Sequence, residues 1–168
     1  MDEFGTNVAM TRRYGWALRG ARCHSAVPFN GGRNITLTMG LRLDGFVAPF
    51  AFEGATNGVA FCAYIETQLA PALKRGDVVV VDNLSAHHAA GIEPVLAAVG
   101  AKLLFLPPYS PDLSPVENCG SKVKALMRAQ APRTTAAVYE AMGHAIGRVT
   151  PSDAIGWFGH CGYRTKRE

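Results

Sequence analysis

The chain of 168 residues has the length of one globular domain, and a chain of this size buries roughly 70% of its unfolded surface. Its composition, 48% hydrophobic and 18% charged, excludes an intrinsically disordered or collagen-like protein. The longest apolar stretches, such as residues 46–52, fall short of the roughly 20 residues that span a bilayer, and no signal segment begins at Met1. We therefore expect a soluble, cytoplasmic protein.

The charge balance is mildly basic. A net charge of +4 favours a polyanionic partner, although it does not identify one. The cysteines stand far apart and form no CxxC pair, which is evidence against a zinc knuckle and against a dense disulfide framework. We expect these four thiols to be reduced: Cys23, Cys62, Cys119 and Cys161.

The first half of the chain predicts a β-hairpin followed by a helix. Apolar and polar residues alternate over residues 33–41, which is typical of a half-buried strand. The stretch GFVAPFAF, from Gly45, is its expected antiparallel partner across an Asp44-Gly45 turn. From Val59 to Leu73 apolar residues recur at helical spacing, and Gly76 should end that helix.

A β-α-β unit is predicted next. The run VVVVDN, residues 78–83, is typical of a central strand covered on both faces. A helix over Ala86–Val99, with Ser85 as its cap and Gly100 as its end, leads to a short strand over Lys102–Leu106.

Helices dominate the rest of the chain. We expect one helix to begin at Pro115 and two further helices to cover Thr135–Arg148 and Pro151–Phe158. A hairpin, a parallel β-α-β unit and terminal helices together predict a mixed α/β layered fold.

Three acids are candidate site residues, and each has an alternative role. Asp82 ends a predicted strand, where open α/β sheets expose ligand sites, but it could also only shape the turn. Glu117 could complete a capping box with Ser114, although the start of a helix also favours the ionised carboxylate that a cation needs. Asp2, followed by Glu3, has the weakest case, because an acidic N-terminus is usually solvated.

Longer motifs join these acids into one hypothesis. The segment VVVVDNLSAHH is followed by LLFLPPYSPDLSPVEN, with 34 residues between Asp82 and Glu117, and an early MDEFG precedes RRYGWALRG. This combination resembles the DDE transposases of bacterial insertion sequences in the mariner superfamily, from Asp2 to about Tyr163. The resemblance implies a ribonuclease-H-like, retroviral-integrase-like fold, a mixed sheet flanked by helices, with its first strand truncated. It also implies that residues 1–168 are one catalytic domain without the family's N-terminal helix-turn-helix region.

The resemblance implies a chemistry as well. Asp2, Asp82 and Glu117 would be the catalytic acids and would hold two divalent ions, Mg²⁺ or Mn²⁺. The enzyme would cleave DNA strands with water and transfer them with a 3′-hydroxyl, acting on transposon ends and target DNA. Its expected partners are double-stranded DNA and either a second copy or a separate helix-turn-helix product.

Two other functions remain open from the sequence. One is a truncated, catalytically inactive fragment that binds DNA or regulates transposition. The other is a small α/β domain that binds a phosphorylated ligand near Asp82, which ranks last because no GxxxxGK[ST] motif is present.

Other residues are candidates around the acids. Asn83 and His87 are four residues apart, so both could face the site and touch a phosphate or orient a carboxylate. Basic residues in the early segment and after Glu117 could neutralise DNA phosphates, although a solvated helix face is the commoner fate of such charges. These candidates are Arg12, Arg13, Arg19, Lys122, Lys124 and Arg128.

Overall fold

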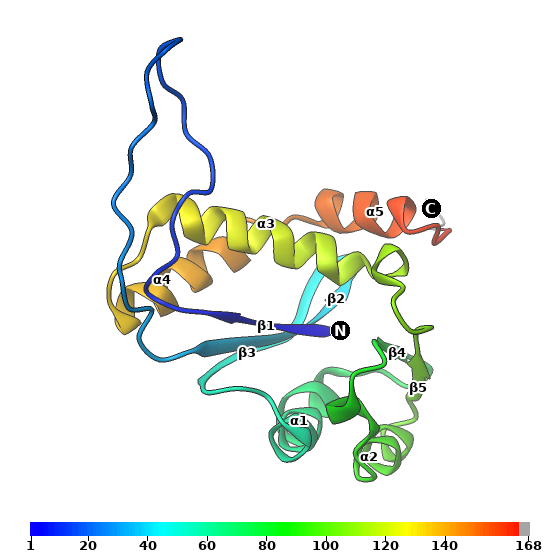
Figure 1. The fold of residues 1–168 in the computed structure, drawn as a ribbon. Coiled ribbons are helices and arrows are strands. Elements are labelled where there is room, and N and C mark those ends of the chain that lie inside the picture. The colour runs from blue at the N-terminus through cyan, green and yellow to red at the C-terminus, as the bar shows by residue number, and fades with distance from the viewer. Residues whose placement is uncertain (165–168) are drawn as a thin grey trace.

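A three-stranded antiparallel sheet forms the first half of the fold (Figure 1). The computed structural model describes residues 1–164. Strand β2 (Ile35–Arg42) is central and pairs with β1 (Asp2–Thr6) and with β3 (Gly45–Glu53). The predicted hairpin is confirmed, with Arg42 opposite Gly45 at the turn. Strand β1, in which Asp2 pairs with Met39, is only five residues long, too short for a clear pattern of alternation.

The predicted β-α-β unit is also present, as a separate two-stranded sheet. Strand β4 (Val78–Val81) pairs in parallel with β5 (Lys102–Phe105). The prediction that β4 is a central strand covered on both faces is wrong, because Val78 is 53% exposed. Within residues 1–164, only one edge of β4 has a strand partner. At the other edge the Met1 ammonium donates a hydrogen bond to the Val80 carbonyl, with 2.6 Å between the two atoms.

The helix expected over Ala86–Val99 is wrong in its first half. The chain forms a 3-10 turn, η3 (Ser85–His88), and then the α-helix α2 (Ile92–Ala98). A continuous helix is prevented by Pro94, whose ring would clash with the carbonyl four residues earlier and which has no N–H to donate to it. Ser85 therefore caps no α-helix.

The other predicted helices are confirmed. Helix α1 (Gly58–Tyr64) continues through a π-helical turn, η1 (Ile65–Leu69), and a 3-10 turn, η2 (Ala70–Ala72). After the 3-10 turn η4 (Pro111–Leu113) come α3 (Pro115–Gln130), α4 (Thr135–Ile146) and α5 (Pro151–His160). Among residues 1–164, no helix is both long and apolar enough to cross a membrane.

The buried side chains form two clusters. The first core lies between the three-stranded sheet and helices α3 and α4 and includes Phe4, Met39, Val116 and Met127. The second core lies around β4, α1 and α2 and includes Val81, Phe61, Ile65 and Leu96. The second core also includes Val47 of β3, so the two cores meet at this strand.

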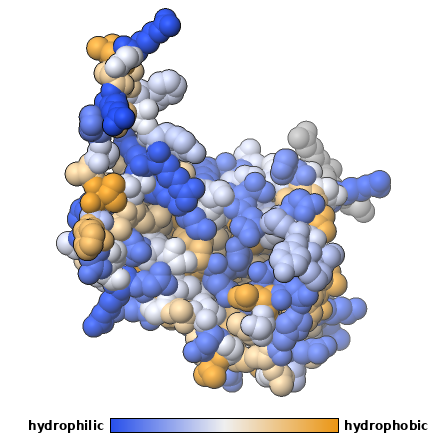
Figure 2. All heavy atoms as spheres, in the orientation of Figure 1, coloured by the Kyte–Doolittle hydropathy of each residue, from blue (hydrophilic) through white to orange (hydrophobic). Residues whose placement is uncertain are grey.

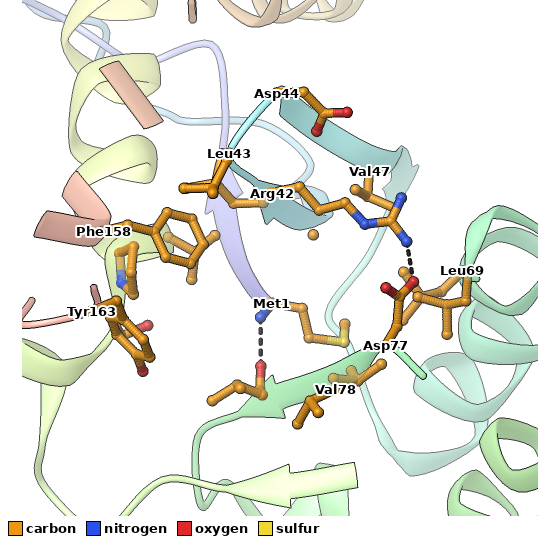
Figure 3. A pocket seen from close by; sticks show the side chains of 18 of the residues that line it. Met1, Arg42, Leu43, Asp44, Val47, Leu69, Asp77, Val78, Phe158 and Tyr163 are labelled. Carbon is orange, nitrogen blue, oxygen red and sulfur yellow. Dashed lines mark hydrogen bonds and ion pairs between the residues drawn. The ribbon is translucent and has the colours of Figure 1, made fainter. Parts of the chain in front are cut away.

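A groove of about 560 Å³ separates the ends of β2 and β4 (Figure 3). Its lining is mainly apolar and includes Leu41, Val47 and Val79. Met1 reaches across one end to β4, and an ion pair between Arg42 and Asp77 crosses it elsewhere. These two contacts join the sheets across the groove.

An arm, residues 7–34, links β1 to β2 and projects well beyond α3 (Figure 1). Its base is held where the Val8 N–H donates to Gly31 and where Arg133 donates to the carbonyls of Val8 and Met10. Strongly hydrophilic residues are spread along it (Figure 2). Between them Trp16 and Phe29 are fully exposed.

Candidate active site

Asp2 and Glu117 lie close enough for their charges to interact. Asp2 begins β1, and Glu117 lies in the first turn of α3, the helix that packs on that strand. Burial first, and the negative charge of Glu117 second, raise the pKa of Asp2 to about 6. Two acids that repel each other in this way are suited to share a cation.

The capping role considered for Glu117 is not seen. Ser114 is the N-cap of α3, but its side chain makes no capping hydrogen bond. The Glu117 N–H donates instead to the Ser114 carbonyl, at 3.1 Å, and Glu117 is exposed. Its carboxylate is therefore available to a ligand at the positive end of the helix.

Asp82 follows β4 and has two local contacts. Its Oδ1 atom accepts a hydrogen bond from the Leu84 N–H at 3.0 Å, so it does shape the turn, as the alternative interpretation held. The same Oδ1 lies 2.6 Å from Nδ1 of His87. The side chain is nevertheless 53% exposed, so it can also meet a ligand from solvent.

The structure brings His87 to the acids but turns Asn83 away from them. His87 is 1% exposed and lies between Asp82 and Glu3. Asn83 instead contacts His88, whose Nε2 is 2.5 Å from Oδ1 of Asn83, and the ring of His88 stacks on Phe105. Burial alone would lower the pKa of His87, but the hydrogen bond and charge of Glu3 and the charge of Asp82 raise it above its ordinary value.

The Met1 ammonium connects the two groups of acids. Burial lowers its pKa, and the opposing influences are the negative charges of Asp2, Asp82 and Glu3. Asp2, Asp82 and Glu3 thus all lie near this buried ammonium group. Within residues 1–164, however, no three His, Cys, Asp or Glu side chains are close enough together to hold one metal ion. Asp2 interacts with Glu117, while Asp82 is held by His87.

Basic residues gather beside this site. A shallow hollow between the arm and α3 is lined by Arg12, Arg13, Lys124 and Arg128. Burial and the charge of Arg13 lower the pKa of Arg128, which places these two guanidinium groups close together. Lys124 also lies over the ring of Phe4, 4.6 Å from its centre.

The other two basic candidates lie elsewhere. Lys122 faces α5, where its ammonium is 2.5 Å from a carboxylate oxygen of Asp153. Arg19 is exposed on the arm, next to the turn at Gly20, and does not line the hollow. Four of the six predicted basic residues therefore line one surface, and these two do not.

The comparison with protein families decides the assignment. The family described as DDE superfamily endonuclease matches residues 1–137. The chain belongs to the DDE superfamily endonucleases. The resemblance to DDE proteins stated from the sequence motifs is thereby confirmed. No curated protein matches the chain.

Solved structures show the fold of this DDE superfamily endonuclease. It is similar to "Mos1 transposase paired-end complex with left transposon end", with TM-score 0.74 and 16% identity over 95% of this chain and 50% of that one. It is also similar to "Crystal structure of the Mos1 mariner paired end complex with Mn", with TM-score 0.70 and 18% identity over 95% and 50%. "Structure of Mos1 transposase catalytic domain and Raltegravir with Mg" gives 0.59 and 16% over 80% and 79%. The chain thus spans about half the length of the first two, and the ribonuclease-H-like mixed fold is confirmed.

Sequence reasoning missed one residue of this DDE superfamily endonuclease. Glu3, which follows Asp2 in an acidic N-terminus, is assigned no role from the sequence, yet the Glu3 side chain is only 11% exposed and contacts His87. The available signal was weak: in a strand, the residue after Asp2 must face the opposite side of the sheet. Only the fold shows that this opposite side is covered by His87.

Proposed function

We propose that this chain is a transposase catalytic domain, residues 1–168, which cuts DNA strands and joins them to target DNA with the help of divalent metal ions. The observation that carries the proposal is the interaction of Asp2 with Glu117 at the start of α3, together with the Met1 ammonium, whose pKa responds to the charges of both Asp2 and Asp82. Membership of an endonuclease family supports it. Strand cleavage would use water, and strand transfer would use a 3′-hydroxyl.

The donor chemistry suits Mg²⁺ or Mn²⁺, because all three proposed ligands offer hard carboxylate oxygens. Asp2 and Glu117 would hold cations together, and cations would stabilise the Asp2 carboxylate, whose pKa is raised by burial first and by the charge of Glu117 second. Asp82 would contribute Oδ2, since its contacts to Leu84 and His87 use Oδ1. When bound at these carboxylates, divalent ions would supply the positive charge that stabilises the oxygens at a reacting phosphate.

The basic hollow supports double-stranded DNA as the partner. Glu117, Ser121, Lys124 and Arg128 recur at helical spacing, so they lie on one face of α3. From Glu117 to Arg128 this face extends for about 16 Å at about 1.5 Å per residue. That length equals about five base-pair steps of about 3.4 Å each. A DNA backbone could thus lie along Lys124 and Arg128 while a phosphate reaches the acids.

The finer partners form part of the same proposal. We expect transposon ends and target DNA as substrates, in the cytoplasm. We also expect a second copy of the chain, or a separate product that carries a helix-turn-helix region. The exposed Trp16 and Phe29 on the arm support contact with another macromolecule, because isolated large aromatic side chains gain free energy when they are covered.

The test is nicking of supercoiled plasmid DNA in the presence of Mn²⁺. The wild type should convert the plasmid to the open circular form, and a variant with Asp82→Asn and Glu117→Gln should not. The matched control carries Asp44→Asn and Glu93→Gln, which remove two exposed acids outside the site, and it should cut like the wild type. Equal cutting by the wild type and the Asp82/Glu117 variant would refute the assignment of these acids.

A second candidate function is DNA binding without catalysis. It is favoured by the lack, among residues 1–164, of three acids close enough to hold one ion, while four basic residues already line one hollow. Such a protein would regulate transposition by occupying DNA. It would bind DNA with the same affinity with or without Mn²⁺ and would not nick the plasmid, whereas Lys124→Ala with Arg128→Ala would weaken binding and reduce its dependence on salt.

A further inference from the structure

Glu3 lies on the opposite face of β1 from Asp2. Successive side chains of a strand point to opposite faces, so Asp2 and Phe4 share one face and Glu3 points away from both. Its carboxylate nevertheless remains inside the protein, with the side chain 11% exposed. A carboxylate that is removed from water in this way needs partners.

The partner of Glu3 is the buried ring of His87. Nε2 of His87 lies 3.2 Å from Oε2 and 3.3 Å from Oε1 of Glu3. The ring also packs on Phe61, with 4.2 Å between the ring centres, and only 1% of the side chain is exposed. Contacts with both Glu3 and Phe61 therefore fix the plane of the imidazole.

The other ring nitrogen of His87, Nδ1, contacts Asp82, the proposed metal ligand. Nδ1 of His87 is 2.6 Å from Oδ1 of Asp82, the oxygen that also accepts from the Leu84 N–H. One oxygen of Asp82 is thereby held on two sides. These contacts hold the half-exposed carboxylate of Asp82 in one orientation and leave its Oδ2 atom for another contact.

We propose that Glu3 is a positioning residue for Asp82, acting through His87. The inference rests on the proposed function, because it gives Asp82 the role of metal ligand. Glu3 lies in β1, whereas Asp82 directly follows β4 of the other sheet. The contacts Glu3–His87–Asp82 therefore also fix the end of β4 relative to β1, the strand that begins with Asp2. Removing such outer partners typically weakens metal affinity by about 10- to 100-fold.

The test is calorimetric titration of the wild type and its variants with Mn²⁺ alone. Glu3→Ala should weaken Mn²⁺ affinity by about 10- to 100-fold. Glu3→Gln keeps an oxygen that can accept from His87, so it should lose less and act as the conservative rescue. The control, Glu53→Gln, removes an exposed acid paired with Arg33 and should leave Mn²⁺ affinity unchanged.

A merely structural role for Glu3 is separated by a double-mutant cycle. If Glu3 acts through His87, Glu3→Ala should have no further effect on Mn²⁺ affinity in protein that already carries His87→Ala. If Glu3 only supports the fold, its substitution should lower the free energy of unfolding and leave the affinity of the folded protein unchanged, which overturns the inference. If Glu3→Ala does not fold, Glu3→Gln and His87→Ala decide together: unchanged Mn²⁺ affinity in both variants overturns the inference.

Asp82→Asn separates this inference from the proposed function. Loss of Mn²⁺ binding in Asp82→Asn, with unchanged affinity in the Glu3 variants, would overturn the positioning role and leave the proposed function intact. Unchanged binding in Asp82→Asn, or no Mn²⁺ binding by the wild type, would overturn both.

Discussion

Replacing Asp2 by asparagine should stabilise the metal-free protein near pH 8 and leave its stability near pH 4 almost unchanged. The fold raises the pKa of Asp2 from 3.8 to about 6, through burial first and the charge of Glu117 second. Between these two values the folded protein binds more protons than the unfolded chain, so the free energy of unfolding falls as the pH rises. Asparagine carries no charge, so the free energy of unfolding of the Asp2→Asn variant should not show this decrease between about pH 4 and pH 8.

The size of the effect follows from the two pKa values. A shift of one pKa unit between the unfolded and folded states corresponds to about 1.4 kcal/mol. Ionisation of Asp2 therefore lowers the free energy of unfolding by roughly 3 kcal/mol at most. For a chain of this length the melting temperature should rise by roughly 2 to 4 °C per kcal/mol. Urea unfolding of the wild type and Asp2→Asn across this pH range, in the presence of a chelator, measures the difference directly.

Asp153→Asn provides a control of opposite sign. The hydrogen bond from Lys122 and those from Thr150 lower the pKa of Asp153 to about 2. The stability that Asp153 contributes is present above its unfolded pKa and is lost as the pH falls through the folded value. Asp153→Asn should therefore destabilise the protein near pH 8. If Asp2→Asn were no more stable than the wild type near pH 8, the argument that burial and Glu117 destabilise the Asp2 carboxylate would be refuted.

Three further substitutions should change the free energy of unfolding, measured in urea. Gly120→Ala should stabilise by about 1 kcal/mol, since alanine favours the helix and its Cβ would lie 3.5 Å from Phe4, an ordinary contact. Ala131→Gly should stabilise by roughly 1 kcal/mol, because Ala131 ends α3 with a φ of 48°. Thr150→Ala should destabilise by about 1 kcal/mol, because it removes the capping box that Thr150 forms with Asp153.

Each of these three predictions has an outcome that contradicts it. A destabilised Gly120→Ala would mean that Phe4 cannot accept the added methyl group. Unchanged stability in Ala131→Gly would mean that the left-handed backbone of Ala131 carries no strain. Unchanged stability in Thr150→Ala, with Thr150→Ser as the control that keeps the hydroxyl, would show that water replaces the cap of α5.

The sequence predicted the elements whose patterns are local. The alternation in residues 33–41 and the helical spacing after Pro115 and Thr135 correspond to β2, α3 and α4. The broken helix was also recognisable in principle, because Pro94 is incompatible with a helix that continues from Ser85. Five residues of β1 carry too short a pattern, and its pairing with β2 depends on contacts across the arm.

The candidate site was predicted only in part. Motif spacing selects Asp82 and Glu117, but local spacing leaves Glu117 equally suited to a capping box, and the side-chain geometry shows only that this box is not formed. Glu3 and His87 are 84 residues apart in the chain, so no periodicity relates them. Equally, helical spacing could not separate Lys122, which pairs with Asp153, from Lys124, which lines the hollow.

The division of the interior into two cores has a consequence for the proposed metal site. Asp2 and Glu117 flank residues of the first core, Phe4 and Val116, whereas Asp82 follows Val81 of the second core. Separately packed units can unfold locally with different free energies. Local unfolding of the second core would therefore move Asp82 away from Asp2 and Glu117 without unfolding the strand pair β1–β2 that holds Asp2. A bound divalent ion would act as a clamp between the cores, and amide hydrogens in β4 and η3 should then exchange more slowly with solvent.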